Sequence, residues 1–257
     1  MDMTQQTIPI LMYHQVDVEP PKGSPMRGLV VAPGTFARQM AALSMLGYRG
    51  LSMGDLLPYL NGEKRGKVFG ITFDDGYENN LRCALPVLKR YGFTSTCYVV
   101  ANLVGKSNSW DMVRGVKQVP LMDAKELQAW IDAGQEVGSH TLNHANLAEL
   151  SGPEQAIEIG ESKAQLESLL VQKGGVKHFC YPYGGLNKTA VQHVKATGYL
   201  TATTTVRGRA IAGQSDDLLL PRVLVSRTTT WMQLLLKCLS RYEDKRAVNH
   251  PGDVYAL

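Results

Sequence analysis

Short apolar runs alternate with longer amphipathic stretches along this 257-residue chain. The alternation is typical of a β/α protein, because parallel strands are buried on both faces and helices cover them. The apolar runs predict strands over residues 8–13, 68–73, 95–100, 136–139, 178–181, 201–205 and 218–225. The amphipathic stretches predict helices over residues 33–46, 79–91, 123–133, 152–171, 188–197 and 229–239. About seven strands with intervening helices predict an α/β fold, a TIM-like (β/α) barrel.

Several helix ends carry the residues expected there. Asp123 precedes a helical stretch with Glu126 three residues later, which is the pattern of a capping box. Gly92, Gly134 and Gly198 each follow a helical stretch, where a left-handed residue commonly ends the helix.

Length and composition favour one globular domain over residues 1–257, with a C-terminal tail from 243 to 257, since barrels of about 250 residues commonly form one domain. The net charge of +4 is modest and the basic residues are scattered, which argues against a nucleic-acid groove or a polybasic membrane patch. No run approaches the roughly 20 apolar residues that span a bilayer. The first residues lack the pattern of a signal peptide, so we expect a cytoplasmic location, although a chain trimmed of its leader would look the same. Oligomeric state stays open.

The four cysteines are Cys83, Cys97, Cys180 and Cys238, and none forms a C-x-x-C pair. This spacing argues against a structural zinc site or a redox pair, so we expect reduced and mostly buried thiols.

Polar residues follow the predicted strands at their C-terminal ends, where barrel enzymes assemble their sites. Asp74 and Asp75 end the apolar run 68–73, and His140 and His144 follow the run 136–139. A catalytic divalent metal typically has three protein ligands and an open water position. We expect Asp75, His140 and His144 to supply these ligands to zinc, with cobalt or nickel as alternatives.

Asp74 is the expected general base, because it adjoins a ligand and metal-bound water needs a proton acceptor. Structural roles are the alternatives. Asp75-Gly76 is also a favoured turn dipeptide, and the histidine pair could be packed or solvated without a metal.

Three segments carry a resemblance to a known family: residues 72–76 (TFDDG), 140–144 (HTLNH) and 179–184 (FCYPYG). In this order and separation they resemble the first three motifs of the polysaccharide deacetylases, carbohydrate esterase family four, also called the NodB-homology domain. Residues 9–16 (PILMYHQV) and 220–223 (LPRV) are similar to the branch that contains the biofilm poly-N-acetylglucosamine deacetylases. The resemblance covers residues 8–226.

The resemblance implies metal-dependent removal of an acetyl group from an N-acetylated sugar, on a distorted barrel with fewer than eight strands. It assigns the base to Asp74 and the ligands to Asp75, His140 and His144. The main-chain amide of Tyr183 would donate to the oxyanion, and its side chain would help to wall the pocket.

Two family features are missing from this chain: the Arg at the head of the third motif and a Leu-x-His near the C-terminus. In the resembling branch these elements are circularly shifted, so His14 would be the general acid and Arg222 would orient Asp74. The structural alternatives are a capping or core role for His14 and a surface ion pair for Arg222. His178 is expected to be a strand residue rather than a substitute for the missing Arg.

We expect Tyr181 and Pro182 of the third motif, together with Trp110, to contact substrate. A sugar platform and a packed core residue are equal alternatives for Trp110. His193 and His250 are expected to be solvated, and the helix over 152–171 is expected to be scaffold.

The expected function is therefore hydrolysis of the acetamide of an N-acetylhexosamine, on a glycan or on a lipid- or nucleotide-linked precursor. Two alternatives stay open: a cytosolic amidohydrolase acting on a small cyclic amide, and a non-catalytic carbohydrate-binding protein. An open groove would suit a glycan and a closed cavity a small ring.

Overall fold

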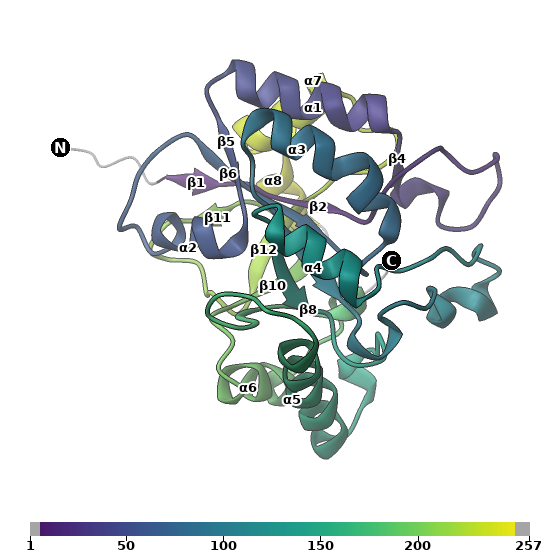
Figure 1. Ribbon diagram of the computed structural model, residues 1–257. Coiled ribbons are helices and arrows are strands. Elements are labelled where there is room, and N and C mark those ends of the chain that lie inside the picture. The colour runs from purple at the N-terminus through teal and green to yellow at the C-terminus, as the bar shows by residue number, and fades with distance from the viewer. Residues whose placement is uncertain (1–5, 250–257) are drawn as a thin grey trace.

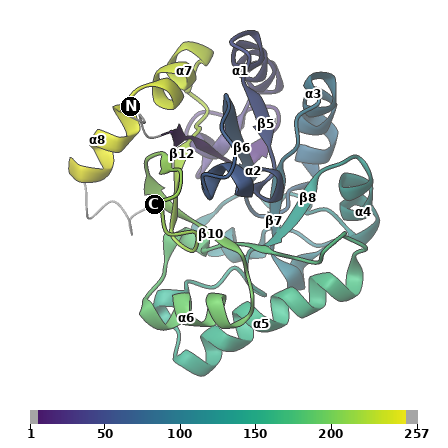
Figure 2. The same ribbon diagram turned by 90° about the vertical axis from the view of Figure 1, so that its left-hand side faces the viewer.

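The computed structural model describes residues 6–249, and in it seven parallel strands close into a barrel (Figures 1 and 2). The closed ring runs in the order β2-β12-β10-β9-β8-β7-β6 and returns to β2. Its strands are β2 (Ile10–Tyr13), β6 (Val68–Phe73), β7 (Thr96–Val99), β8 (Glu136–Ser139), β9 (His178–Cys180), β10 (Thr201–Arg207) and β12 (Leu220–Leu224). The predicted barrel of about seven strands is confirmed.

An additional strand, β5 (Arg49–Leu51), lies outside the ring. It pairs with residues 68–70 at the start of β6, whereas β7 pairs with residues 72 and 73 at its end. Because β2 pairs with β6 as well, the two short strands share the remaining edge of β6. This arrangement distorts the barrel.

Eight α-helices lie around the strands (Figure 2). They are α1 (Pro33–Met45), α2 (Met53–Leu60), α3 (Leu85–Tyr91), α4 (Ala124–Asp132), α5 (Gly152–Leu169), α6 (Lys188–Ala196), α7 (Trp231–Leu239) and α8 (Tyr242–Asn249). A π-helical turn, η2 (Asn80–Ala84), leads into α3, and the 3-10 helices are η1 (Arg27–Leu29), η3 (Ala101–Leu103), η4 (Ser109–Arg114), η5 (Leu147–Glu149) and η6 (Pro182–Gly184). No helix of residues 6–249 is both long and apolar enough to cross a membrane.

The predicted helix ends are confirmed. Asp123 accepts a hydrogen bond from the amide of Glu126, whose carboxylate accepts one from the amide of Asp123, so the capping box is complete. Gly92, Gly134 and Gly198 all have positive φ angles just beyond α3, α4 and α6.

The structure differs from the sequence prediction at both ends of the chain. Pro9 interrupts the strand expected over 8–13, because it has no amide hydrogen to donate. The result is β1 (Thr7–Ile8), which pairs with β11 (Ala210–Ile211), followed by β2. The expected tail from residue 243 begins instead as α8, whose Glu243 receives two hydrogen bonds from Arg207. Residues 250–257, including His250, lie outside the described residues.

Three further elements were not predicted: α2 and the paired strands β3 (Gln15–Val16) and β4 (Val30–Val31). Helix α2 is short and contains Pro58, which weakens its sequence pattern. Its N-cap is Ser52, which accepts from the amide of Asp55. Strands of two residues are too short to produce a readable alternation.

Aromatic side chains fill the space between the barrel and its outer helices. Phe73 on β6 lies edge-on to Trp130 of α4, with ring centroids 5.8 Å apart, and close to Phe36 of α1 at 5.9 Å. Trp130 is fully buried, and its indole nitrogen donates to the carbonyl of Glu136, 3.2 Å away. One side chain therefore joins α4 to two strands.

Replacement of Trp130 by Ala should lower the free energy of unfolding by about 3–5 kcal/mol, because it leaves a large cavity and removes the indole hydrogen bond. Urea denaturation measures the change. The control is Trp231→Ala, because Trp231 is 40% exposed on α7 and should cost less than about 1 kcal/mol. Equal losses in the two variants would contradict this account of the core.

Candidate active site

The predicted site residues meet at the C-terminal rim of the barrel, and strand register explains why. Tyr13 of β2 pairs with Phe73 of β6, so the residues that follow them, His14 and Asp74, are neighbours at the rim. His14 Nε2 lies 3.9 Å from Asp74 Oδ2. The amide of Asp74 donates to the carbonyl of Tyr13 at 2.9 Å, which fixes the chain at this point.

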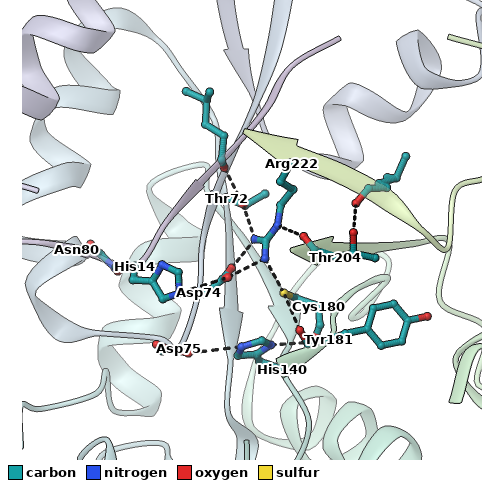
Figure 3. Close-up of polar contacts among 12 residues, drawn as sticks. His14, Thr72, Asp74, Asp75, Asn80, His140, Cys180, Tyr181, Thr204 and Arg222 are labelled. Carbon is teal, nitrogen blue, oxygen red and sulfur yellow. Dashed lines mark hydrogen bonds and ion pairs between the residues drawn. The ribbon is translucent and has the colours of Figure 1, made fainter. Parts of the chain in front are cut away.

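Arg222 points from β12 into the barrel and binds the carboxylate of Asp74 (Figure 3). Its Nη1 and Nη2 donate to the two carboxylate oxygens of Asp74 at 2.7 and 2.8 Å. Both side chains are buried, so the alternative role of Arg222, a surface ion pair, is wrong. Burial favours the neutral form of Asp74, but the charge and hydrogen bonds of Arg222 outweigh it and lower the pKa of this carboxyl. Asp74 is therefore ionised at neutral pH.

The side chains of Asp75, His140 and His144 converge on one point. Asp75 Oδ1 lies 3.4 Å from His140 Nε2 and 3.2 Å from His144 Nε2. Around a tetrahedral ion with ligand bonds of about 2.0–2.1 Å, neighbouring ligand atoms lie roughly 3.3–3.4 Å apart. The separations in this cluster therefore fit three ligands of one metal ion.

The hydrogen bonds around this cluster also fit a cation. His140 Nδ1 lies 2.8 Å from the carbonyl oxygen of Cys180, so in the neutral ring Nδ1 carries the hydrogen and Nε2 presents a lone pair to Asp75. Asp75 Oδ1 is buried and has no hydrogen-bond partner within the described part of the chain. Burial favours the neutral form of Asp75, but His140 and His144, when their Nε2 atoms are protonated, donate to this carboxylate and hold its pKa well below its usual range. Such a donor set suits zinc, cobalt or nickel.

A second cluster with metal-ligand spacing contains Asp74, His140 and Cys180. Its members already have other partners, because Arg222 binds both oxygens of Asp74 and donates to Cys180 Sγ at 3.2 Å. A metal ion here would face a buried guanidinium cation. The cluster of Asp75, His140 and His144 is therefore the better metal site.

Glu158 of α5 holds the loop that carries both histidines, a role that the sequence analysis missed. Its Oε2 accepts from the amides of Leu142 and Asn143, each at 3.0 Å, and its Oε1 accepts from the side chain of Asn143 at 2.6 Å. Helix α5 was expected to be scaffold only. The feature of the sequence that could have indicated this role is that Glu158 falls on the buried face of an amphipathic helix.

Left-handed backbone conformations are concentrated in the three motif segments. Non-glycine residues with positive φ there are Asp75 (75°), Thr141 (64°), His144 (60°) and Tyr183 (58°). Gly184 follows with a φ of 71°, and a Cβ at this position would collide with the side chain of Thr205. The third motif therefore needs Gly both for its φ angle and for this close approach.

A pocket with a volume of about 260 Å³ opens beside the metal-ligand cluster. The ring of Trp110 stacks on His144 with centroids 4.4 Å apart, and Tyr183 meets the same imidazole edge-on at 4.5 Å. Trp110 thus packs against His144 and also lines the pocket, and its use as a sugar platform stays a prediction. Apolar side chains also line the pocket: Met12, Met26, Leu29, Val116 and Leu224.

The remaining predicted residues lie in different places. Tyr181 lines the pocket, but its ring points away from the metal cluster and its hydroxyl donates to the carbonyl of Leu218 at 3.2 Å (Figure 3). Pro182 is buried and does not line the pocket. His178 begins β9, at the end of the barrel away from the site, and contacts Thr201 at 2.7 Å, so its prediction as a strand residue is confirmed. His193 lies on α6.

Comparison with known proteins identifies the family. The sequence pattern of the family described as polysaccharide deacetylase matches residues 61–202, which is more than half of the chain. The chain belongs to this family. The match includes all three motifs and therefore the whole cluster of Asp75, His140 and His144.

Solved structures of deacetylases have the same fold. A Streptococcus pyogenes deacetylase, PplD, solved in complex with acetate, superposes with a TM-score of 0.79 at 28% identity, covering 91% of this chain and 99% of that one. A Bacillus cereus polysaccharide deacetylase, BC0361, superposes with a TM-score of 0.75 at 28% identity, covering 91% and 69%. A Staphylococcus aureus poly-β-1,6-N-acetyl-D-glucosamine N-deacetylase is 26% identical over 203 residues, or 76% of this chain and 68% of its own length.

Replacement of Glu158 by Ala should weaken zinc binding about 10- to 100-fold, because the histidine loop loses three hydrogen bonds that hold it. Titration of the metal-free protein with zinc against a coloured chelator measures the affinity without any substrate. Glu161→Ala is the matched control, since Glu161 lies exposed on the same helix. Equal zinc affinity in both variants would show that the loop needs no support from Glu158.

Proposed function

We propose that this protein is a metal-dependent hydrolase that removes the N-acetyl group of an N-acetylhexosamine in a glycan or glycan precursor. The observation that carries the proposal is the cluster of Asp75, His140 and His144 with the carboxylate of Asp74 beside it, all at one pocket. Membership of the polysaccharide deacetylase family and the named activity of the Staphylococcus aureus relative support it.

Asp75, His140 and His144 would hold the metal ion. When bound there, a divalent ion makes water more acidic and polarises a carbonyl group. The three side chains provide two neutral nitrogens and one anionic oxygen, which leaves an ion such as zinc with a net positive charge for this purpose.

Asp74 would accept the proton of the attacking water. Each of its oxygens receives a bond from Arg222 and retains a further lone pair, so the carboxylate can still accept a proton. Its lowered pKa makes Asp74 a weak base, so it would depend on the metal to make the attacking water more acidic. Arg222 thus keeps the base ionised and fixes its orientation.

His14 would give a proton to the nitrogen that leaves as an amine. Its ring is only partly exposed and lies on the side of Asp74 that faces the pocket. Because the base and the acid lie close together, both can reach one acetamide group. The base would take a proton from the attacking water, and the acid would give one to the leaving nitrogen.

Tyr183 would supply an amide hydrogen to the oxygen of the former carbonyl. The residue lies beside His144 and has a left-handed backbone, which directs its peptide group differently from that of the preceding strand. Donors fixed in position before the reaction stabilise the growing charge without reorganisation.

The same observations argue against the two alternatives, a carbohydrate-binding protein and a hydrolase of small cyclic amides. A protein that only binds carbohydrate needs no ionised base and imidazole beside a metal-ligand cluster, and both are present here. A small cyclic amide would be held by a closed cavity, whereas this pocket opens at the barrel rim and is lined by aromatic side chains that can pack on a sugar ring.

Asp74→Asn should reduce acetate release from N-acetylglucosamine oligomers by about 10²–10⁴-fold, because the base is lost. Zinc affinity should stay near the wild-type value, since Asp74 is not in the ligand set. Chelator should stop release by the wild-type protein, and added zinc or cobalt should restore it. Asp132→Asn, on the exposed side of α4, is the control. Full activity of the Asp74 variant would exclude this base, and a wild-type protein inactive on every N-acetylated sugar would exclude the substrate class.

Arg222→Met should move the acid limb of the pH profile of kcat/KM to higher pH. Arg222 lowers the pKa of Asp74, so its removal leaves burial to raise that pKa. The reaction needs Asp74 ionised, and activity is then lost as the pH falls through this higher value. Arg222→Lys retains a positive charge and should shift the limb less. An unshifted acid limb in a folded Arg222→Met protein would contradict this coupling.

A further inference from the structure

One carboxylate at the pocket has no part in the mechanism above. Asp111 lines the pocket from η4, on the loop between β7 and α4. The residue is only 5% exposed, and its Oδ1 has no hydrogen-bond partner among the described residues. Buried carboxylate oxygens normally have partners, because an unpaired buried acceptor is costly.

The loop that carries Asp111 is fixed at its base. The buried side chain of Asn108 accepts from the amide of Val119 at 2.7 Å and donates to the carbonyl of Lys117 at 3.3 Å. Residue 110 is fixed as well, because the ring of Trp110 stacks on His144. Asp111 therefore has a defined position relative to the metal-ligand cluster.

The nearest cation leaves Asp111 incompletely paired. In a 3-10 helix, side chains three residues apart lie on the same side, which places Arg114 beside Asp111. Arg114 Nη1 is 3.7 Å from Asp111 Oδ1, too far for a hydrogen bond. Its guanidinium instead lies over the ring of Tyr183, 5.0 Å from the centroid, and half of the side chain is exposed.

The other acidic groups at the pocket are already engaged. Asp74 is bound by Arg222, and Asp75 faces the two histidines. Asp111 is thus the carboxylate at this pocket that is left for a ligand. Whether it is ionised or protonated, it retains an oxygen that accepts a hydrogen bond.

We propose that Asp111 accepts a hydrogen bond from a ring hydroxyl of the N-acetylated sugar and so determines specificity for a hydroxylated substrate. This inference rests on the proposed function and adds to it a residue that recognises the sugar rather than the acetyl group. A site built to bind a hydroxyl group discriminates strongly against analogues that lack it, because its buried acceptor then stays unpaired.

The test compares two acetylated substrates with the zinc-loaded protein. One is an N-acetylglucosamine oligomer, and the other is 4-nitrophenyl acetate, which has an acetyl group but no hydroxyl. Asp111→Ala should lower the ratio of kcat/KM for the sugar to kcat/KM for the ester by about 10- to 100-fold, because the sugar hydroxyl loses its buried acceptor. Asp111→Asn keeps an accepting oxygen and should recover part of the ratio.

Two controls separate recognition from a structural role. Arg114→Gln removes the neighbouring cation and should change the ratio less than about threefold, since the ion pair is loose and half-exposed. Asp132→Asn should leave the ratio unchanged. An equal fall for sugar and ester in Asp111→Ala, or an Arg114→Gln protein that reproduces it, would overturn the proposal. A wild-type protein that cleaves the ester and no sugar would instead overturn the proposed function.

Discussion

The guanidinium of Arg222 is the interaction on which the site and the barrel interior both depend. Its five N–H groups make five hydrogen bonds: one to the carbonyl of Thr204, one to Thr72, two to Asp74 and one to Cys180. A fully buried cation is tolerated only when its donors are satisfied and its charge is paired, and both conditions hold here. Since these partners lie on β6, β9 and β10, one side chain from β12 joins four strands. The base is thus positioned by the same contacts that hold the barrel together.

Closure of the ring has a second effect on the site. β2 pairs with β6 on one side and with β12 on the other, so the first strand of the barrel lies between the strands of the base and of its arginine. The residue that follows β2 must then lie next to the base. In the proposed mechanism, this neighbourhood lets His14, near the start of the chain, serve as the acid that the family resemblance places near the end. Only position in the ring matters for proton transfer, and order along the chain does not.

The sequence predicted the parts of the structure that depend on local patterns. The apolar runs gave the seven barrel strands within a few residues, and the rule that polar residues gather at strand C-termini brought Asp75, His140 and His144 together. Local patterns could not reveal Glu158, because its partners lie about 15 residues away and its helix reads as ordinary amphipathic scaffold. Nor could they reveal that β5 and β7 share one edge of β6, which depends on how many strands close the ring.

The left-handed residues of the motifs connect chemistry with stability. Such a conformation costs a non-glycine residue of order 1–3 kcal/mol, and glycine would avoid the cost. Yet Asp75 and His144 belong to the proposed metal-ligand cluster and Tyr183 lines the pocket, so exchange for glycine would remove a side chain that the proposed function needs. At these positions the residue that would stabilise the fold most differs from the residue that the site needs. Selection for thermal stability alone would therefore tend to erase the site, and the rest of the barrel must be stable enough to tolerate it.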